Sequence, residues 1–134
     1  MEGPPIKNKS VTFKIVNVSH SIALGIGLKE IIKGKGYKIN FSQIGHGGFM
    51  ASYNKYLYSH HDKTSNMVMQ GISYTPNDEV TVTVKPDSLV VSKKGDNKSA
   101  TIPLKKMTEA DWKQACFAVC LGGNGDKIEI INSG

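Results

Sequence analysis

Short runs in which apolar and polar residues alternate recur along the chain, separated by turn residues. Val80, Val82 and Val84, for example, alternate with Thr81 and Thr83. Because neighbouring residues of a strand point to opposite faces, this period of two is typical of half-buried β-strands. The pattern predicts about ten strands: Val11–Ile15, Ile22–Leu28, Tyr37–Phe41, Gly48–Tyr53, Tyr56–Ser59, Val80–Val84, Leu89–Val91, Ala100–Ile102, Ala115–Leu121 and Lys127–Asn132.

The predicted strand Ile22–Leu28 has an unusual second face. Its large apolar residues alternate with Ala23, Gly25 and Gly27 instead of with polar residues. Small side chains at these positions predict a strand that is crowded from both sides.

Two stretches favour single helical turns. Lys29–Lys33 can form one turn, which Gly34 would end. Thr108 together with Asp111 can cap a second turn that carries Trp112. Trp112 is the only tryptophan, and it is either a lid over one end of a core or an exposed platform for a ligand.

Strands joined by such short links must run mostly antiparallel, because a parallel pair needs a crossover of a dozen or more residues. The fold class that we expect is all-β, a two-layer antiparallel β-sandwich with one or two short helical turns. No linker or repeat interrupts the pattern. One domain over residues 11–134 is therefore expected, preceded by a flexible segment over residues 1–10.

Composition supports a sheet protein, whereas the charge excludes only some partners. The chain has 10 Val, 13 Ile and 7 Thr against 6 Leu and 6 Ala, and β-branched side chains pack well on a pleated surface. The net charge of +6 rests on 17 Lys without any Arg. Arg supplies the planar fork that grips phosphates and base edges, so sequence-specific binding of nucleic acid is not expected.

The sequence also contains no signal for a membrane or for secretion. No apolar run approaches the roughly 20 residues of a membrane span. Residues 1–10 lack the apolar centre of a secretory signal. We therefore expect an intracellular, cytoplasmic protein with no membrane partner.

Cys116 and Cys120 lie four residues apart in a predicted strand, and hence on one face. Their Cα atoms would then be about 13 Å apart, which is too far for a disulfide. Because no further ligands lie nearby at metal-binding spacing, we expect no metal site and interpret both as buried small hydrophobic residues.

The dipeptide His60-His61, followed by Asp62, is the main candidate for titratable chemistry. Successive strand residues point to opposite faces, so the two imidazoles converge only if the segment is a loop. His46 could join them from the preceding turn. A metal or catalytic site, a binding loop and a solvated loop all remain possible, and no nucleophile in a recognisable elbow favours catalysis.

The stretch Gly122–Asp126 is rich in glycine and follows an apolar strand, as a phosphate-binding loop does. However, it lacks the Gly-Lys-Ser/Thr ending, and a strand follows it instead of a helix. We therefore expect a hairpin loop whose glycines adopt positive φ.

Tyrosines concentrate between residues 53 and 58. Alternation places Tyr56 and Tyr58 on one face and Leu57 on the other. The two rings form either an exposed aromatic patch of the kind that anchors partners or a cross-strand pair within a core.

The order of these pieces resembles a SPRY domain, a concanavalin-like β-sandwich that recognises proteins. The series runs from an early strand through a glycine-led strand, a Leu-Tyr-Ser/His segment and a turn into a Val-rich strand, and ends in a final pair. The matching segments are Ile22–Gly27, Gly45–Met50, Lys55–His60, Gly71–Val84, Ser88–Lys93, Phe117–Leu121 and Lys127–Asn132. The resemblance spans roughly Val11 to Asn132, although no single motif in it is specific.

The resemblance implies a non-catalytic interaction module that binds a peptide or protein surface through loops at one edge of the sandwich, without a cofactor. It assigns this role to the turn before the Leu-Tyr strand and to the loop between the last two strands. Together with the histidines, the candidate ligand-binding residues are Tyr53, Asn54, Lys55, Tyr56, His60, His61, Gly122, Gly123 and Asn124. The last loop departs from many peptide-binding members because it has no aromatic residue. The alternatives are a carbohydrate-binding lectin-like sandwich and a structural subunit of a larger assembly.

Overall fold

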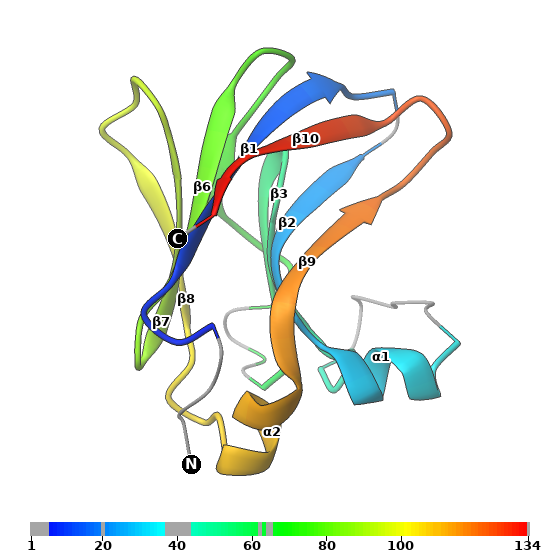
Figure 1. Cartoon of the computed structure of the whole chain (residues 1–134), viewed down its shortest axis with the longest axis vertical. Helices are drawn as coiled ribbons and strands as arrows, with labels where there is room; N and C mark the ends of the chain where they lie inside the picture. The colour runs from blue at the N-terminus through cyan, green and yellow to red at the C-terminus, as the bar shows by residue number, and fades with distance from the viewer. Residues whose placement is uncertain (1–5, 20, 37–43, 62, 64–65, 134) are drawn as a thin grey trace.

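The computed structural model describes residues 6–19, 21–36, 44–61, 63 and 66–133, and these form two antiparallel sheets of five strands each (Figure 1). In spatial order, sheet A consists of β10 (Lys127–Ser133), β1 (Ser10–Asn17), β6 (Glu79–Val84), β7 (Ser88–Lys93) and β8 (Ser99–Pro103). Sheet B consists of β5 (Val68–Ser73), β4 (Asn54–Ser59), β3 (Gly48–Ser52), β2 (Ile22–Leu28) and β9 (Ala115–Leu121). The expected two-layer antiparallel β-sandwich is confirmed.

Two short helices, α1 (Lys29–Gly34) and α2 (Glu109–Gln114), lie at the same end of the sandwich, which is the lower end in Figure 1. Helix α1 follows β2 directly, and α2 leads directly into β9. Both helices therefore flank sheet B. The expected helical turns are confirmed at both positions.

The core lies between the two sheets, where alternate residues of each strand meet. In β6, Val80, Val82 and Val84 are fully buried, whereas Thr81 and Thr83 are partly exposed. The alternation in the sequence therefore identifies the inner face of this strand correctly.

Strand β2 is buried on both faces, as its small residues predict. All seven of its residues are buried. A Cβ atom at Gly25 would collide with the backbone carbonyl oxygen of Phe49 in β3, and one at Gly27 would lie 2.7 Å from the Cδ1 atom of Ile32 in α1. The glycines thus allow close approach of a neighbouring strand and of a helix.

The connection between β9 and β10 is not the hairpin that we expect from the sequence. Strand β9 pairs with β2 in sheet B, whereas β10 pairs with β1 in sheet A. The link between β1 and β2 passes from sheet A to sheet B in the same way. β9 and β10 are close in sequence, which suggested a hairpin, but each pairs with a strand near the start of the chain.

The strand prediction misses β5. Its sequence, Val68–Ser73, lacks a regular alternation, contains Gly71 and is mostly exposed at the edge of sheet B. Only Ile72 of this strand is buried, so there is no period-two signal to detect. The predicted strand Tyr37–Phe41 lies outside the described residues.

Packed structure begins earlier than Val11. Ile6 is only 7% exposed and belongs to the core, and the backbone N–H of Asn8 donates a hydrogen bond of 2.8 Å to the carbonyl oxygen of Val84. Residues 6–10 are therefore tied to sheet A and do not form part of a flexible segment.

Trp112 is the expected lid over one end of the core. It is 6% exposed, belongs to the core, and has the Lys7 Nζ atom 4.9 Å from its ring centroid. Thr108 and Asp111 form the predicted cap, in which each side chain accepts a hydrogen bond of 3.1 Å from the other residue's backbone N–H. The cap and the buried indole together position α2.

Removing the cap should destabilise the protein without unfolding it. We expect Thr108→Ala to lower the free energy of unfolding by about 1 kcal/mol, because the N–H of Asp111 loses its acceptor. Thr108→Ser keeps the hydroxyl and should retain most of that stability. Urea denaturation of the two variants tests this, and equal losses in both would contradict a role for the hydroxyl.

Candidate functional site

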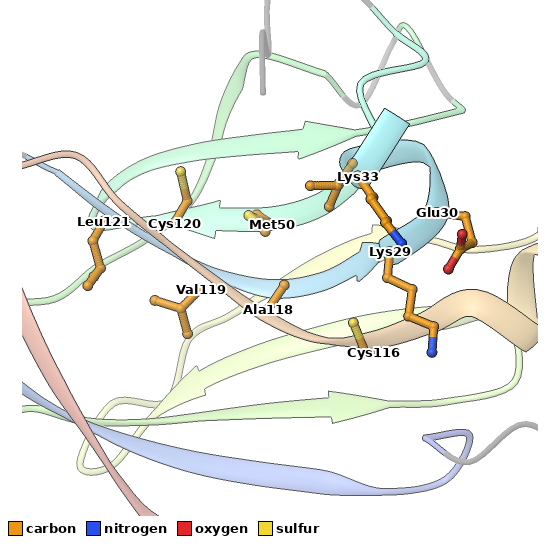
Figure 2. Close-up of a pocket in the computed structure, with 10 residues that line it drawn as sticks. Lys29, Glu30, Lys33, Met50, Cys116, Ala118, Val119, Cys120 and Leu121 are labelled. Carbon is orange, nitrogen blue, oxygen red and sulfur yellow. The ribbon is translucent and has the colours of Figure 1, made fainter. Parts of the chain in front are cut away.

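A hollow of about 550 Å³ lies between α1 and β9 on the outer side of sheet B (Figure 2). We call it the β9 groove. It is lined mainly by Lys29, Glu30 and Lys33 of α1, by Met50 of β3, and by Cys116 and residues 118–121 of β9. Its sides are thus apolar along β9 and charged along α1.

The groove exists because the outer face of β2 carries almost no side chains. Across this face Ala118 of β9 pairs with Gly25 of β2, and Gly25 pairs with Met50 of β3. With a glycine in the middle, the sheet is hollowed between its edge strand and its centre. The sequence pattern located this row of small residues, although it did not show what lies beside it.

Helix α1 is fixed against the start of β9 by Gln114, the last residue of α2. The Gln114 side-chain oxygen accepts hydrogen bonds from the backbone N–H groups of Glu30, at 2.9 Å, and Ile31, at 3.2 Å. Lys29 and Lys33 are four residues apart, so they lie on one face of the helix, and both are exposed. The sequence analysis missed these lysines, although their i, i+4 spacing was visible.

The two cysteines line the groove and are only partly buried, so the expectation of two buried hydrophobic residues is wrong. Both are free, and they lie on the outer face of β9. The Cys116 Sγ atom is 3.7 Å from the carbonyl oxygen of Gly27. Burial raises the pKa of the Cys120 thiol, which favours its neutral form.

Tyr56 and Tyr58 share the outer face of sheet B with the groove. Tyr58 pairs with Met50, and Leu57 points inward with 3% of its surface exposed, as the alternation predicts. Burial raises the pKa of the Tyr58 hydroxyl, with smaller contributions from the nearby Tyr56 and Cys120. Both rings are partly exposed, so they form an aromatic surface on the far side of β3 from β9.

The turn from β3 to β4 holds the other candidate residues of this region. Tyr53 packs against the core, and its N–H donates a hydrogen bond of 2.8 Å to the carbonyl oxygen of Ile22. The Asn54 side-chain oxygen accepts a hydrogen bond of 2.7 Å from the Ser52 hydroxyl. Lys55 has a φ of 75° at an irregularity in the pairing of β4 with β5, and it is exposed.

The loop with Gly122, Gly123 and Asn124 adjoins one end of the groove, where Leu121 ends β9. None of these residues has a positive φ, contrary to the expectation for a hairpin. Gly122 is needed for another reason, since a Cβ atom there would collide with the Ser21 hydroxyl oxygen. The loop therefore packs closely against the link between β1 and β2.

The buried carboxylate of Asp126 holds these two links together. Asp126 is 4% exposed, and its oxygens accept backbone hydrogen bonds from Ser19 at 2.6 Å, Ser21 at 3.2 Å and Gly123 at 2.7 Å. The Ser19 hydroxyl lies 3.3 Å from the same carboxylate. Three backbone N–H groups from two loops thus converge on one side chain, which the sequence showed only as the end of a glycine-rich stretch.

The three described histidines do converge. The ring centroids of His60 and His61 are 4.7 Å apart, and those of His46 and His60 are 6.4 Å apart. The His61 Nε2 atom lies 3.2 Å from a carboxylate oxygen of Asp111 in α2. The loop therefore brings His60 and His61 together, whereas Asp62 lies outside the described residues.

Hydrogen bonds assign a structural role to two of these imidazoles. The Nδ1 atom of His46 accepts the N–H of Gly48 at 3.0 Å, and the Nδ1 atom of His60 accepts the N–H of Gly47 at 2.9 Å. The Nε2 atom of His46 lies 2.9 Å from the side-chain oxygen of Asn66. An imidazole that accepts an N–H through Nδ1 must be unprotonated there, so this arrangement requires neutral rings.

The protein should lose stability as the pH falls through the range in which these histidines titrate. Burial lowers the folded-state pKa of both His46 and His60 from 6.5. The neighbouring His61 lowers the pKa of His60 further and Asp111 opposes this, while the hydrogen bond to Asn66 opposes the shift at His46. The stabilisation is therefore complete above about pH 6.5 and is lost as the pH falls below that value. Urea denaturation between about pH 7.5 and about pH 5.5 should show the decrease.

The double variant His46→Gln/His60→Gln is the control, because glutamine accepts a hydrogen bond and does not titrate. Its stability should change little over the same pH range. A decrease as steep as that of the unmodified protein would assign the effect to other groups.

The nine predicted site residues fall into two groups at opposite ends of β4. The turn at Tyr53 and the loop at Gly122 lie near each other. The N–H of Tyr53 donates to the carbonyl oxygen of Ile22, and the N–H of Gly122 donates to that of the adjacent Ser21. His60 and His61 follow the other end of β4, and at about 3.3 Å per residue about 20 Å of strand separates Asn54 from His60. Of the first group, the loop at Gly122 follows Leu121 at the end of the β9 groove, whereas the β4 residues lie beyond β3. At the other end, His60 accepts the N–H of Gly47, next to α1.

Trp112 cannot act as the exposed platform of a sugar site, because it is buried in the core. Among the described residues, no group of three or more His, Cys, Asp or Glu side chains is arranged to hold a metal ion. No described helix combines the length and apolar character that crossing a bilayer requires. Neither a protein-family model nor a curated protein matches this chain.

Proposed function

We propose that this chain is a non-catalytic, SPRY-like protein-interaction module that binds a peptide or protein surface at the β9 groove. One observation carries the proposal: a hollow of about 550 Å³, apolar on one side and lysine-bearing on the other, lies on the outer side of sheet B. Mixed apolar and polar hollows of roughly 300–1,000 Å³ are typical of ligand sites. A groove of this size accepts a few side chains of a bound segment.

The surroundings of the groove extend the binding surface. Gly122, Gly123 and Asn124 follow the groove's end at Leu121, and Tyr56 lies on the same outer face beyond β3. Aromatic rings beside a hollow are frequent anchors in protein interfaces. Tyr56 lies on β4, and the loop is held by its packing on Ser21 and by Asp126, so the surface is formed before the partner arrives.

The rival functions have less support. A lectin site built on Trp112 is excluded, because the indole is buried in the core. A structural subunit without a ligand of its own needs no groove, and it would bind no short peptide in isolation.

A selection from a library of random peptides of about twelve residues tests the proposal. Peptides should be enriched on the unmodified protein and should fail to bind Ala118→Arg, because an arginine there fills the groove. Thr101→Arg is the matched control, since Thr101 is exposed on β8 in the other sheet and the variant should bind as before. Thermal melting confirms that both variants are folded. No enrichment, or enriched peptides that also bind Ala118→Arg, would rule out the groove as the site.

A further inference from the structure

Strand β9 differs from the other strands that end the two sheets. Within the described part of the chain, sheet A ends in β10 and β8, and sheet B ends in β5 and β9. An edge strand exposes a row of unpaired N–H and C=O groups, so proteins protect such edges with charges, proline or irregular pairing.

Three of the four edges carry such protection. Strand β10 contains Lys127 and Glu129 and pairs with β1 through two register shifts. Strand β8 is short and ends in Pro103. Strand β5 has a register shift against β4 and a glycine in its interior.

Strand β9 has none of these features. Its sequence, Ala115–Leu121, contains no charged residue and no proline. It pairs with β2 at seven consecutive positions without a register shift, so its free edge is regular too. Such an edge is a template for the addition of another strand.

The β9 groove runs along this edge strand. Residues 118–121 all line it, although successive residues of a strand point to opposite faces. The hollow therefore reaches the backbone of this edge strand as well as the side chains on its outer face. Figure 2 shows Cys116, Ala118 and Cys120 on one side of β9 and Val119 on the other.

The charges beside the groove select the partner. Lys29 and Lys33 are exposed at its rim, and neither forms an ion pair with a carboxylate of the described residues, while Glu30 supplies one opposing charge. The chain as a whole has a net charge of +6. A second copy would bring the same lysines and the same net charge, so charge complementarity favours an acidic partner over self-pairing.

We propose that β9 accepts an extended acidic segment of a partner protein as a sixth strand of sheet B, with acidic side chains next to Lys29 and Lys33. The inference rests on the proposed function and specifies the partner for it. Backbone hydrogen bonds to β9 supply the affinity, small side chains of the segment enter above Ala118, and the two lysines select for negative charge.

A defined probe tests this inference separately from the library selection. The probe is a fluorescein-labelled peptide in which Glu and Val alternate, and its affinity is measured by fluorescence anisotropy. A peptide of alternating Lys and Val should bind at least about tenfold more weakly. Two further versions carry N-methyl groups on alternate amides, in the two possible frames. Strand addition predicts that one frame loses binding and the other keeps it, because only alternate N–H groups point to β9.

The lysines are tested with a pair of charge-matched variants. Lys29→Glu/Lys33→Glu should weaken binding of the acidic probe about tenfold, whereas Lys94→Glu/Lys98→Glu, in the β7–β8 turn, should weaken it only slightly. An equal loss of affinity in both variants would show that only the net charge matters, and it would contradict a specific role for the lysines of α1.

The outcomes distinguish the two proposals. If the library yields groove-dependent peptides but the acidic probe does not bind, or both N-methyl frames behave alike, strand addition to β9 is wrong and the interaction module stands. If neither binds, both proposals fail. Self-association through β9, seen by light scattering and abolished in Ala118→Arg, would replace the acidic segment with a second copy.

Discussion

Asp126→Ala is expected to lower the free energy of unfolding by about 2–4 kcal/mol, because it leaves buried backbone donors without an acceptor. The carboxylate is 4% exposed and accepts hydrogen bonds from the N–H groups of Ser19, Ser21 and Gly123. These donors belong to the two links that pass between the sheets. The variant should therefore loosen the junction that joins β1 and β2 on one side and β9 and β10 on the other.

Asp87→Ala is the matched control, because Asp87 is exposed in the turn between β6 and β7. Its free energy of unfolding should stay within about 0.5 kcal/mol of the unmodified protein. Guanidinium denaturation followed by tryptophan fluorescence gives both values. If Asp126→Ala is as stable as Asp87→Ala, other groups satisfy the two links.

Gly25→Ala should be at least as damaging, because backbone atoms surround the site of the new methyl group. A Cβ at Gly25 would collide with the carbonyl oxygen of Phe49 and lie 2.8 Å from the Cα of Met50. Neither atom can move without separating β2 from β3 in the middle of sheet B. We expect a loss of about 3 kcal/mol or more in the free energy of unfolding.

Gly34→Ala, at the end of α1, is the corresponding control. No atom of the described residues lies within 4 Å of a Cβ built there, and Gly34 does not have a positive φ. Alanine also has the higher helix propensity, so this variant should be neutral or slightly more stable. Similar melting temperatures for the two glycine variants would show that sheet B adapts to the methyl group.

The same row of small residues joins the stability argument to the proposed function. A Cβ atom at Gly25 would collide with the backbone of β3, and the absence of a side chain there also hollows the outer face next to Ala118. A substitution that fills this position would thus affect folding and binding together. Ala118→Arg is the better functional test because Ala118 lies on the edge strand, which has room to accommodate change.

The strands and their buried faces followed from local patterns. The alternation of Val80, Val82 and Val84 and the small face of Ile22–Leu28 placed both strands correctly. A period of two depends only on neighbouring residues, so it is visible in one dimension. The cap formed by Thr108 and Asp111 was predictable for the same reason, since its partners are three residues apart.

The candidate site was predicted only in part. The loop geometry expected for His60 and His61 does bring their rings together. However, His60 accepts a hydrogen bond from the backbone N–H of Gly47, as His46 does from Gly48, and His60 and His61 lie at the opposite end of β4 from Tyr53 and Asn54. The sequence did not indicate that Lys29 and Lys33 line the groove, because their short helix gives no sign of the strand that lies beside it.

Local chemistry was thus enough to define an antiparallel sandwich and the inward side of most strands. The order of strands within the sheets depends on contacts between distant segments, such as β2 with β9 and β1 with β10, which leave no periodic signal. Among the described strands, that order leaves β9 at the edge of sheet B and sets α1 beside it. It also lets the loop residue Asp126 join the two links between the sheets. Long-range pairing, which buries side chains from distant parts of the chain against one another, decided all three.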